Sequence, residues 1–114
     1  MLKLNHKDLT VYKKSIDLVK EIYLLTNELP PEERFGLQSQ LRRASVSIPS
    51  NISEGSARKS DIERKRFYEI ARSSLVEVDT QIVICISLNY LTTNDIQRLE
   101  KLANEVFAML SAMQ

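Results

Sequence analysis

Glycine and proline are scarce in this chain, and that scarcity constrains the fold more than any other feature. Two glycines and three prolines occur among 114 residues. Because these residues punctuate most turns, a chain with so few of them must consist of long regular elements joined by few connections. A content of 43% hydrophobic and 27% charged residues is typical of a chain that folds around a core rather than one that stays disordered. We therefore expect a single domain over residues 1–114.

The first element runs from about Asp8 to about Glu28 and has the period of a helix. Its apolar residues recur at spacings of three and four, as on one helical face. They form two stripes, the first of Leu9, Tyr12, Ile16, Val19 and Tyr23 and the second of Val11, Leu18, Ile22, Leu25 and Leu29. We assign the first stripe to the core, so the second predicts an additional partner. Pro30 and Pro31 end the helix.

The second element begins near Phe35 and Gly36 and contains a proline. Its stripe consists of Leu37, Leu41, Ala44, Ile48, Ile52 and Gly55. A proline inside a helix costs about 3 kcal/mol, because it lacks an N–H and its ring approaches the carbonyl four residues earlier. The spacing nevertheless continues through Pro49, which favours one helix kinked at Pro49. The alternative is a helix that ends near Ser47 and a new one that begins at Pro49.

The third element begins with a capping box, Ser60 to Glu63, in which each side chain can bond to the other residue's free amide. Its helical stripe continues to about Tyr90. The run Ile82–Ile86 resembles a β-strand because it is apolar and rich in β-branched residues, but the chain offers it no strand partner. We interpret this run as part of the helix.

The fourth helix is expected to begin at Thr93 or Asn94. Its stripe consists of Ile96, Leu99, Ala103, Val106, Leu110 and Met113. Four helices with short connections predict an all-α, antiparallel up-and-down four-helix bundle. The surplus apolar residues, which include the second stripe of the first helix, Ile82–Ile86, Leu102 and Met109, favour a ring-like homo-oligomer. The alternative is a monomer with an unusually large core.

Several functional classes are excluded by the residues that the chain lacks. Cys85 and His6 are the only residues of their types, which argues against a disulfide framework, a metal cluster or a catalytic triad. We therefore expect no enzymatic activity and no cofactor. The longest apolar run, Ile82–Ile86, is far shorter than the roughly 20 residues that span a bilayer, and residues 1–7 lack a signal-peptide core. These features predict a cytoplasmic protein without membrane contact.

The charges are unevenly distributed although their sum is only +1. The segment from Leu37 to Arg72 holds eight cations against four carboxylates, a balance of +4. These cations are the candidate nucleic-acid contacts: Arg42, Arg43, Arg58, Lys59, Arg64, Lys65, Arg66 and Arg72. Ring assembly would multiply them into a belt that neutralises phosphates. The alternative is a solvated helix face with local pairs, such as Arg66 with Glu69 or Glu63.

Other polar and aromatic residues are weaker candidates. Asp79, Thr80 and Gln81 lie together between apolar stretches, and we interpret them as a buried network that fixes register, or as the lining of an interhelical cavity. Tyr68 and Tyr90 could stack on bases, but interleaved basic and aromatic residues are lacking around them.

Two motifs of the chain are similar to a known family. The run Gly36–Gly55, GLQSQLRRASVSIPSNISEG, and the run Arg66–Val78, RFYEIARSSLVEV, followed by Thr80 and Gln81, resemble four-helix bundle proteins encoded in intervening sequences of bacterial large-subunit (23S) ribosomal RNA genes. The resemblance implies an up-and-down bundle, a proline inside a helix and a homopentamer. It implies no ribosomal function and no catalytic residues.

A relative of that family, the accessory variability protein of diversity-generating retroelements, shares the bundle and ring and is thought to bind nucleic acid together with a reverse transcriptase. The resemblance thus implies RNA or DNA, and a protein such as a reverse transcriptase, as partners. Our leading hypothesis is a non-enzymatic oligomeric scaffold that contacts RNA or DNA weakly through its basic segment. The competing hypothesis is a protein-interaction module that docks a polypeptide without nucleic acid.

Overall fold

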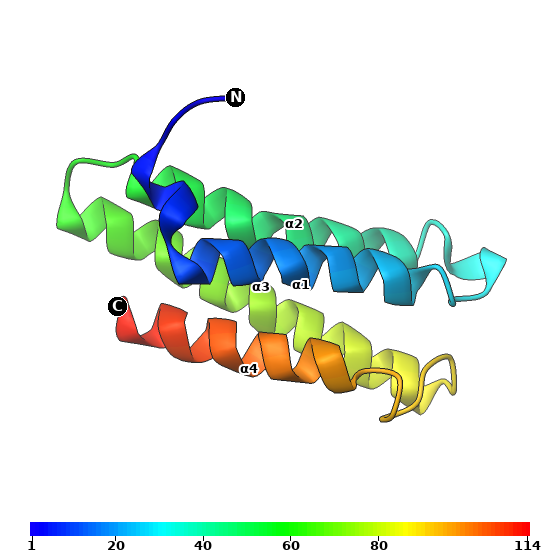
Figure 1. The fold of residues 1–114 in the computed structure, drawn as a ribbon. Helices are drawn as coiled ribbons and strands as arrows, with labels where there is room; N and C mark the ends of the chain where they lie inside the picture. Colours follow the sequence, from blue (N-terminus) through cyan, green and yellow to red (C-terminus); the bar gives the residue numbers. More distant parts are fainter.

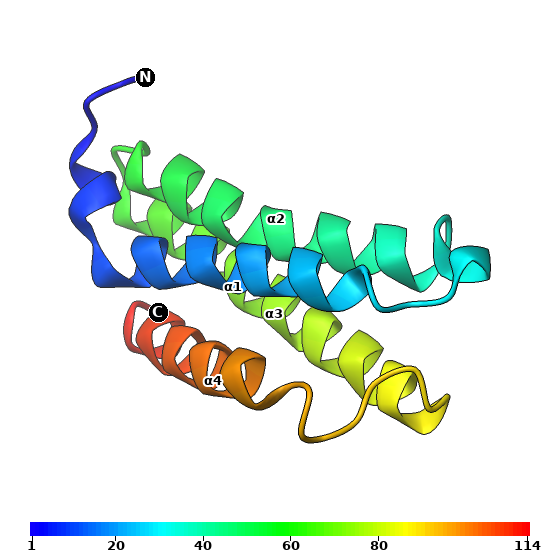
Figure 2. The ribbon, with the colours of Figure 1, turned by 45° about the vertical axis from the view of Figure 1, so that its right-hand side comes forward.

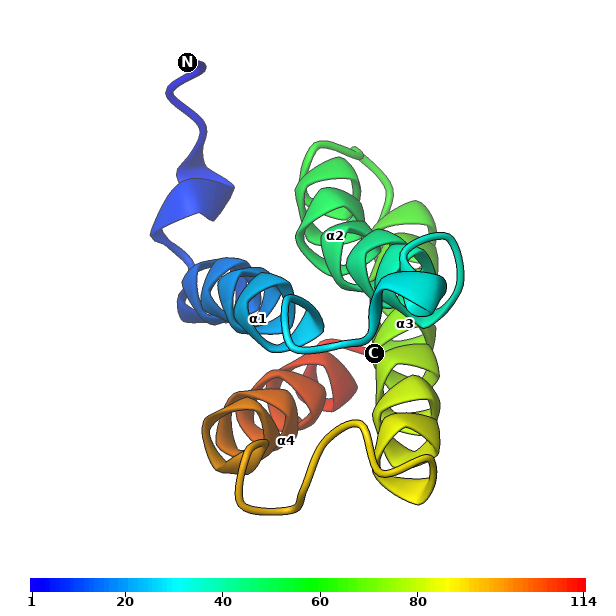
Figure 3. The ribbon, with the colours of Figure 1, turned by 90° about the vertical axis from the view of Figure 1, so that its right-hand side faces the viewer.

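The computed structural model describes residues 1–114 and shows four α-helices, two short 3-10 helices and no strand. The elements are η1 (Asn5–Asp8), α1 (Thr10–Thr26), η2 (Pro31–Glu33), α2 (Leu37–Ser56), α3 (Asp61–Ser87) and α4 (Gln97–Ala112). Successive helices run in opposite directions (Figure 1). Helix α4 returns to pack against α1 and closes the bundle (Figure 3). The expected all-α fold of four helices is confirmed.

Helix α1 buries the opposite stripe from the one that we expected. Its core face consists of Val11, Leu18, Ile22 and Leu25, and Leu29 continues this face beyond the helix. The stripe of Leu9, Tyr12, Ile16, Val19 and Tyr23 is exposed or half-buried. The two stripes are similarly apolar, and the expectation that the first is buried was wrong because α2 and α4 pack against the second. Ser15 and Thr26 are buried on this face as well. Their hydroxyls donate to the carbonyls of Tyr12 and Ile22 at 2.7 Å, so no polar hydrogen is left unbonded.

Helix α2 runs through Pro49 without interruption, so the alternative of two separate helices is wrong. Nearby side chains bond to backbone carbonyls of the same helix. Ser45 donates to the carbonyl of Arg42 at 3.0 Å, and Ser50 donates to that of Val46 at 2.8 Å. Proline has no N–H, so the helix lacks one backbone hydrogen bond at Pro49. The serine hydroxyls nearby are satisfied by these local bonds to carbonyls.

Helix α3 begins as predicted and ends three residues earlier than predicted. The hydroxyl of Ser60 accepts a hydrogen bond from the backbone N–H of Glu63 at 3.0 Å, and Ile82–Ile86 is helical. At the other end Asn89 adopts a left-handed conformation with φ of 64°. The N–H of Asn89 then bonds to the carbonyl of Ile86, and that of Tyr90 to the carbonyl of Cys85. This is a Schellman motif, which stops the helix at Ser87.

Helix α4 begins at Gln97, later than the predicted Thr93 or Asn94. Thr92 and Asp95 hold the preceding residues in a turn, because each side chain accepts a hydrogen bond from the other residue's N–H, at 2.9 and 3.2 Å. Leu102, expected to be surplus apolar surface, is buried in the core, and Met109 packs against it.

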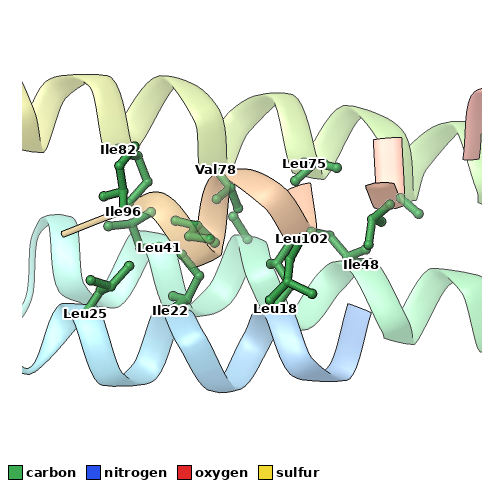
Figure 4. Packing of buried hydrophobic residues seen from close by; sticks show 14 of the residues in the cluster. Leu18, Ile22, Leu25, Leu41, Ile48, Leu75, Val78, Ile82, Ile96 and Leu102 are labelled. Carbon is green, nitrogen blue, oxygen red and sulfur yellow. The ribbon is translucent and has the colours of Figure 1, made fainter. Parts of the chain in front are cut away.

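The core is one cluster of 22 buried apolar residues drawn from all four helices and their connections. Figure 4 shows side chains of α1, α2, α3 and α4 pointing into a common interior. Cys85 is fully buried there, and burial raises the pKa of its thiol. None of the helices combines the length and hydropathy that crossing a bilayer requires.

Neighbouring helices differ in how closely they pack. Helices α2 and α3 have the most extensive contact and α3 and α4 the least extensive of the four pairs. Gly55 allows the close approach of α2 to α3, because a Cβ atom there would lie 2.8 Å from the Tyr68 ring and 2.9 Å from Cβ of Phe67. Figure 2 shows that α3 extends well beyond α4, so that only part of α3 lies beside α4. The molecule therefore has a tight side and an open side.

Candidate interaction surfaces

The eight predicted cations do not form one surface. Arg42, Arg64 and Arg72 are half-buried and bonded within the molecule, whereas Arg43, Arg58, Lys59, Lys65 and Arg66 are exposed.

Arg42 ties α2 to α1. Its guanidinium lies over the Tyr23 ring, 4.5 Å from the centroid, and donates to the hydroxyl of Thr26 at 2.9 Å and to the amide oxygen of Asn27 at 3.0 Å. All of these partners are neutral, so the Arg42 charge stays unneutralised beside an exposed aromatic ring. A stacked, multiply bonded guanidinium stabilises helix packing and cannot turn freely toward a phosphate.

Arg64 holds the connection between α2 and α3. It donates to the carbonyls of Arg58 and Lys59 at 2.7 and 2.9 Å and pairs with Asp61. This bonding fixes the backbone of the connection, so that the neighbouring side chains of Arg58 and Lys59 project from a defined loop.

Arg72 bridges α3 and α4. Its guanidinium lies over the Phe107 ring, 4.6 Å from the centroid, donates to the hydroxyl of Ser111 at 3.0 Å, and lies 3.5 Å from Glu69. It is thus occupied by contacts within the bundle.

Four of the five exposed cations gather at one end of the bundle. Arg58 and Lys59 lie in the connection between α2 and α3, and Lys65 and Arg66 lie in the first two turns of α3. Arg43 lies apart from them, midway along α2. Of the group, Arg58 also stacks on Phe67, with its guanidinium 4.8 Å from the ring centroid.

The fold adds two cations that the sequence pattern did not place there. The N-terminal segment reaches the same end of the bundle (Figure 1), where it contributes exposed Lys3 and half-buried Lys7. Only the folded chain brings these distant segments together, so no local signal could have identified them. We call this set the basic end: Lys3, Lys7, Arg58, Lys59, Lys65 and Arg66.

An apolar groove of about 270 Å³ lies between α3 and α4. Its lining is mostly apolar and includes Leu75, Val76, Val78, Ile82, Ile96, Leu99, Ala103 and Phe107. Asp79, Glu100 and Asn104 are its polar lining residues. No ion pair of the structure involves Asp79 or Glu100. Arg72 stacks on Phe107, so a positive charge lies at the Phe107 edge of the groove.

The predicted polar network of Asp79, Thr80 and Gln81 is wrong, because the structure separates its members. Asp79 and Thr80 are exposed, and Asp79 lines the groove toward α4. Gln81 is buried toward α2, where its amide nitrogen donates to the side-chain oxygens of Gln40 at 3.4 Å and Glu77 at 3.2 Å. Its side-chain oxygen has no hydrogen-bond partner.

The two tyrosines considered for base stacking are occupied inside the fold. The Tyr68 ring is buried and its hydroxyl bonds to that of Ser56 at 3.1 Å. Tyr90 donates to a carboxylate oxygen of Glu33 at 3.1 Å, and this bond raises the pKa of the Tyr90 hydroxyl. No group of three or more His, Cys, Asp or Glu side chains is placed to hold a metal ion.

The chain is similar to proteins of one family. A family model described as "23S rRNA-intervening sequence protein" matches residues 7–112. Among solved structures, a protein of unknown function from the S23 ribosomal protein family of Bacteroides thetaiotaomicron superposes with a TM-score of 0.83 at 23% identity, over 91% of this chain and 97% of that chain. At this identity the likeness shows a shared fold. The comparison with curated proteins finds no match.

Proposed function

The chain belongs to the 23S rRNA-intervening sequence protein family, and we propose that it serves as a non-enzymatic, homo-oligomeric scaffold that contacts RNA or DNA through its basic end. The observation that carries the proposal is the gathering of exposed cations around one connection. Arg58, Lys59, Lys65 and Arg66 are exposed and, unlike Arg42, Arg64 and Arg72, have no hydrogen-bonded side-chain partner within the bundle. A ring, of five copies as the family resemblance implies, would repeat this cluster around its axis.

The exposed apolar side chains support the oligomer. Leu9, Ile16, Tyr23 and Leu24 on α1 and its N-cap are 37–63% exposed, and Val76 and Val83 on α3 are 50% and 54% exposed. Two such groups on different sides of one small bundle favour contact between copies.

Phosphate contacts make binding depend on salt, because each contact releases counterions. We therefore expect the protein to bind a structured RNA at low salt and to lose affinity steadily as salt rises. The basic-end variant Lys65→Glu/Arg66→Glu should lose at least about tenfold in affinity at 50 mM salt and show a shallower salt slope.

The control variant, Arg34→Glu/Lys101→Glu, makes the same change in net charge at exposed residues away from the basic end. It should change affinity about twofold at most, because screening weakens distant charges. Fluorescence anisotropy with one labelled RNA measures both variants. Equal losses in the two, or no binding by the wild type at low salt, would contradict the nucleic-acid contact.

A protein-docking module is the second candidate, and the α3–α4 groove favours it. A mostly apolar groove with a few polar lining groups is the kind of surface that takes a helix or an extended peptide from a protein. A polypeptide partner, a reverse transcriptase among the candidates, that stays bound to the purified protein after nuclease treatment would favour this function.

A further inference from the structure

Two partly exposed apolar surfaces of the bundle have complementary charge. One is the outer stripe of α1, which consists of Leu9, Tyr12, Ile16, Val19 and Tyr23. The other is the α3–α4 groove. We infer that the groove of one copy binds the outer stripe of a second copy of this chain. This inference rests on the proposed homo-oligomer and names its contact surfaces.

The outer stripe has the spacing of a helical ridge and is only partly covered by its own bundle, where Tyr12 packs against the core and the ring of His6. Leu9, Ile16 and Tyr23 recur every seven residues and are 41%, 37% and 41% exposed. Arg42 of α2 covers one face of the Tyr23 ring, which places the stripe on the α2 side of α1. The groove lies across the bundle, between α3 and α4. A chain therefore cannot fill its own groove with its own stripe.

The groove matches part of the stripe in length. Along α3 the groove extends from Leu75 to Ile82, eight residues that rise about 10 Å. The stripe from Leu9 to Tyr23 is about twice as long, and its eight residues from Tyr12 to Val19, with Ile16 near the middle, would cover the groove. A helix laid in an apolar groove makes contacts of this kind through residues at spacings of three and four.

The charges are complementary as well. Lys13 and Lys20 lie beside the outer stripe, are exposed and take part in no ion pair. Asp79 and Glu100 line the groove and also take part in no ion pair. Docking would bring two cations to two carboxylates. Opposite charges on two surfaces steer encounter and set the register of the contact.

The geometry also bears on the kind of assembly. Because the two surfaces differ, the contact is heterologous, and an open chain of copies has a free stripe at one end and a free groove at the other until a ring closes. An isologous dimer, in contrast, would use the same surface on both copies.

Charge reversal on each side tests the contact. The stripe variant is Lys13→Glu/Lys20→Glu, and the groove variant is Asp79→Lys/Glu100→Lys. All four residues are exposed, so each variant should keep the helical circular-dichroism spectrum and thermal unfolding of the wild type. Each variant alone places like charges across the interface, and we expect its association to weaken at least tenfold in sedimentation velocity.

Restoration separates this contact from a general effect of charge. When the stripe variant and the groove variant are mixed in equal amounts, each contact between unlike copies joins opposite charges, so association should return, although a ring with an odd number of copies cannot close by strict alternation. The chain that carries all four substitutions should also assemble. Matched controls are Arg34→Glu/Arg43→Glu and Glu28→Lys/Glu32→Lys, which reverse exposed charges elsewhere and should leave the native mass unchanged.

Three results would overturn the inference in different ways. If the wild type is oligomeric and both variants keep its mass, the copies associate through other surfaces while the proposed oligomer stands. If the variants dissociate and neither mixing nor the chain with all four substitutions restores association, the two surfaces do not meet each other. If the wild type itself is a monomer, the oligomer of the proposed function fails together with the contact.

Discussion

The two sides of α3 show different packing. Toward α2, α3 packs closely, and the hydroxyls of Ser47 and Ser74 lie 2.9 Å apart across the interface. Gly55 sits against Tyr68 with no room for a side chain. Toward α4, α3 leaves an apolar groove of about 270 Å³. The difference teaches that one side of this helix maintains the fold, whereas the other side has surface left for a partner.

Adding atoms on the tight side should have the largest effect on stability. Gly55→Leu places a branched side chain where even a Cβ atom would lie 2.8 Å from the Tyr68 ring. Overpacking of this kind costs about 1–3 kcal/mol, more than the helix propensity gained by replacing glycine. Urea denaturation measures the loss in the free energy of unfolding. An unchanged midpoint would show that α2 and α3 can separate freely.

Adding atoms on the open side should cost far less. Ala103 lines the groove and is half-buried, so the larger side chain of Ala103→Leu finds empty space. We expect the free energy of unfolding to stay within about 0.5 kcal/mol of the wild type, as for a tolerated surface change. The same urea titration applies. A loss as large as that of Gly55→Leu would mean that the two sides of α3 are packed alike.

The smallest expected effect on stability concerns the ion pairs that join α4 to α1, since α4 has limited contact with α3. Two ion pairs join α4 to α1, Lys14 with Glu105 and Arg98 with Glu21. The hydrogen bond from Lys14 lowers the pKa of the Glu105 carboxyl below its ordinary value of 4.5. A carboxyl whose pKa is lower in the folded than in the unfolded state stabilises the fold at pH values above its unfolded-state pKa. This contribution is lost as the pH falls through the folded-state pKa.

Glu105→Gln should therefore lower the melting temperature by about one or two degrees at pH 7, because a single ion pair at the surface, even half-buried, contributes little. The difference from the wild type should shrink as the pH falls below 4.5. Thermal unfolding followed by circular dichroism at several pH values checks this. A difference that stays constant down to pH 2 would show that the carboxyl acts through packing and not through its charge.

Local features of the sequence predicted the local features of the fold. Periodicity through Pro49 predicted one helix because a loop would have broken the register, and Ser60 predicted the start of α3 because its cap acts within one turn. The end of α3 was missed, although Asn89 is a residue type that favours the left-handed conformation that stops a helix.

Features that depend on tertiary contacts were not predictable in this way. The two stripes of α1 are both apolar, and only the positions of α2 and α4 decide which one is buried. The cations of the basic segment look equivalent in the sequence. Their separation into bonded residues, such as Arg42 and Arg72, and free ones, such as Lys65, follows from rings and carbonyls on other elements.

The native mass of the wild-type protein tests the central claim most directly, which is that copies of the chain cover the apolar surface left on α1 and α3. Light scattering at micromolar concentrations, at low and at high salt, should return a multiple of the 13.1 kDa chain mass, as a single closed species. A particle of 13.1 kDa under both conditions would contradict the claim.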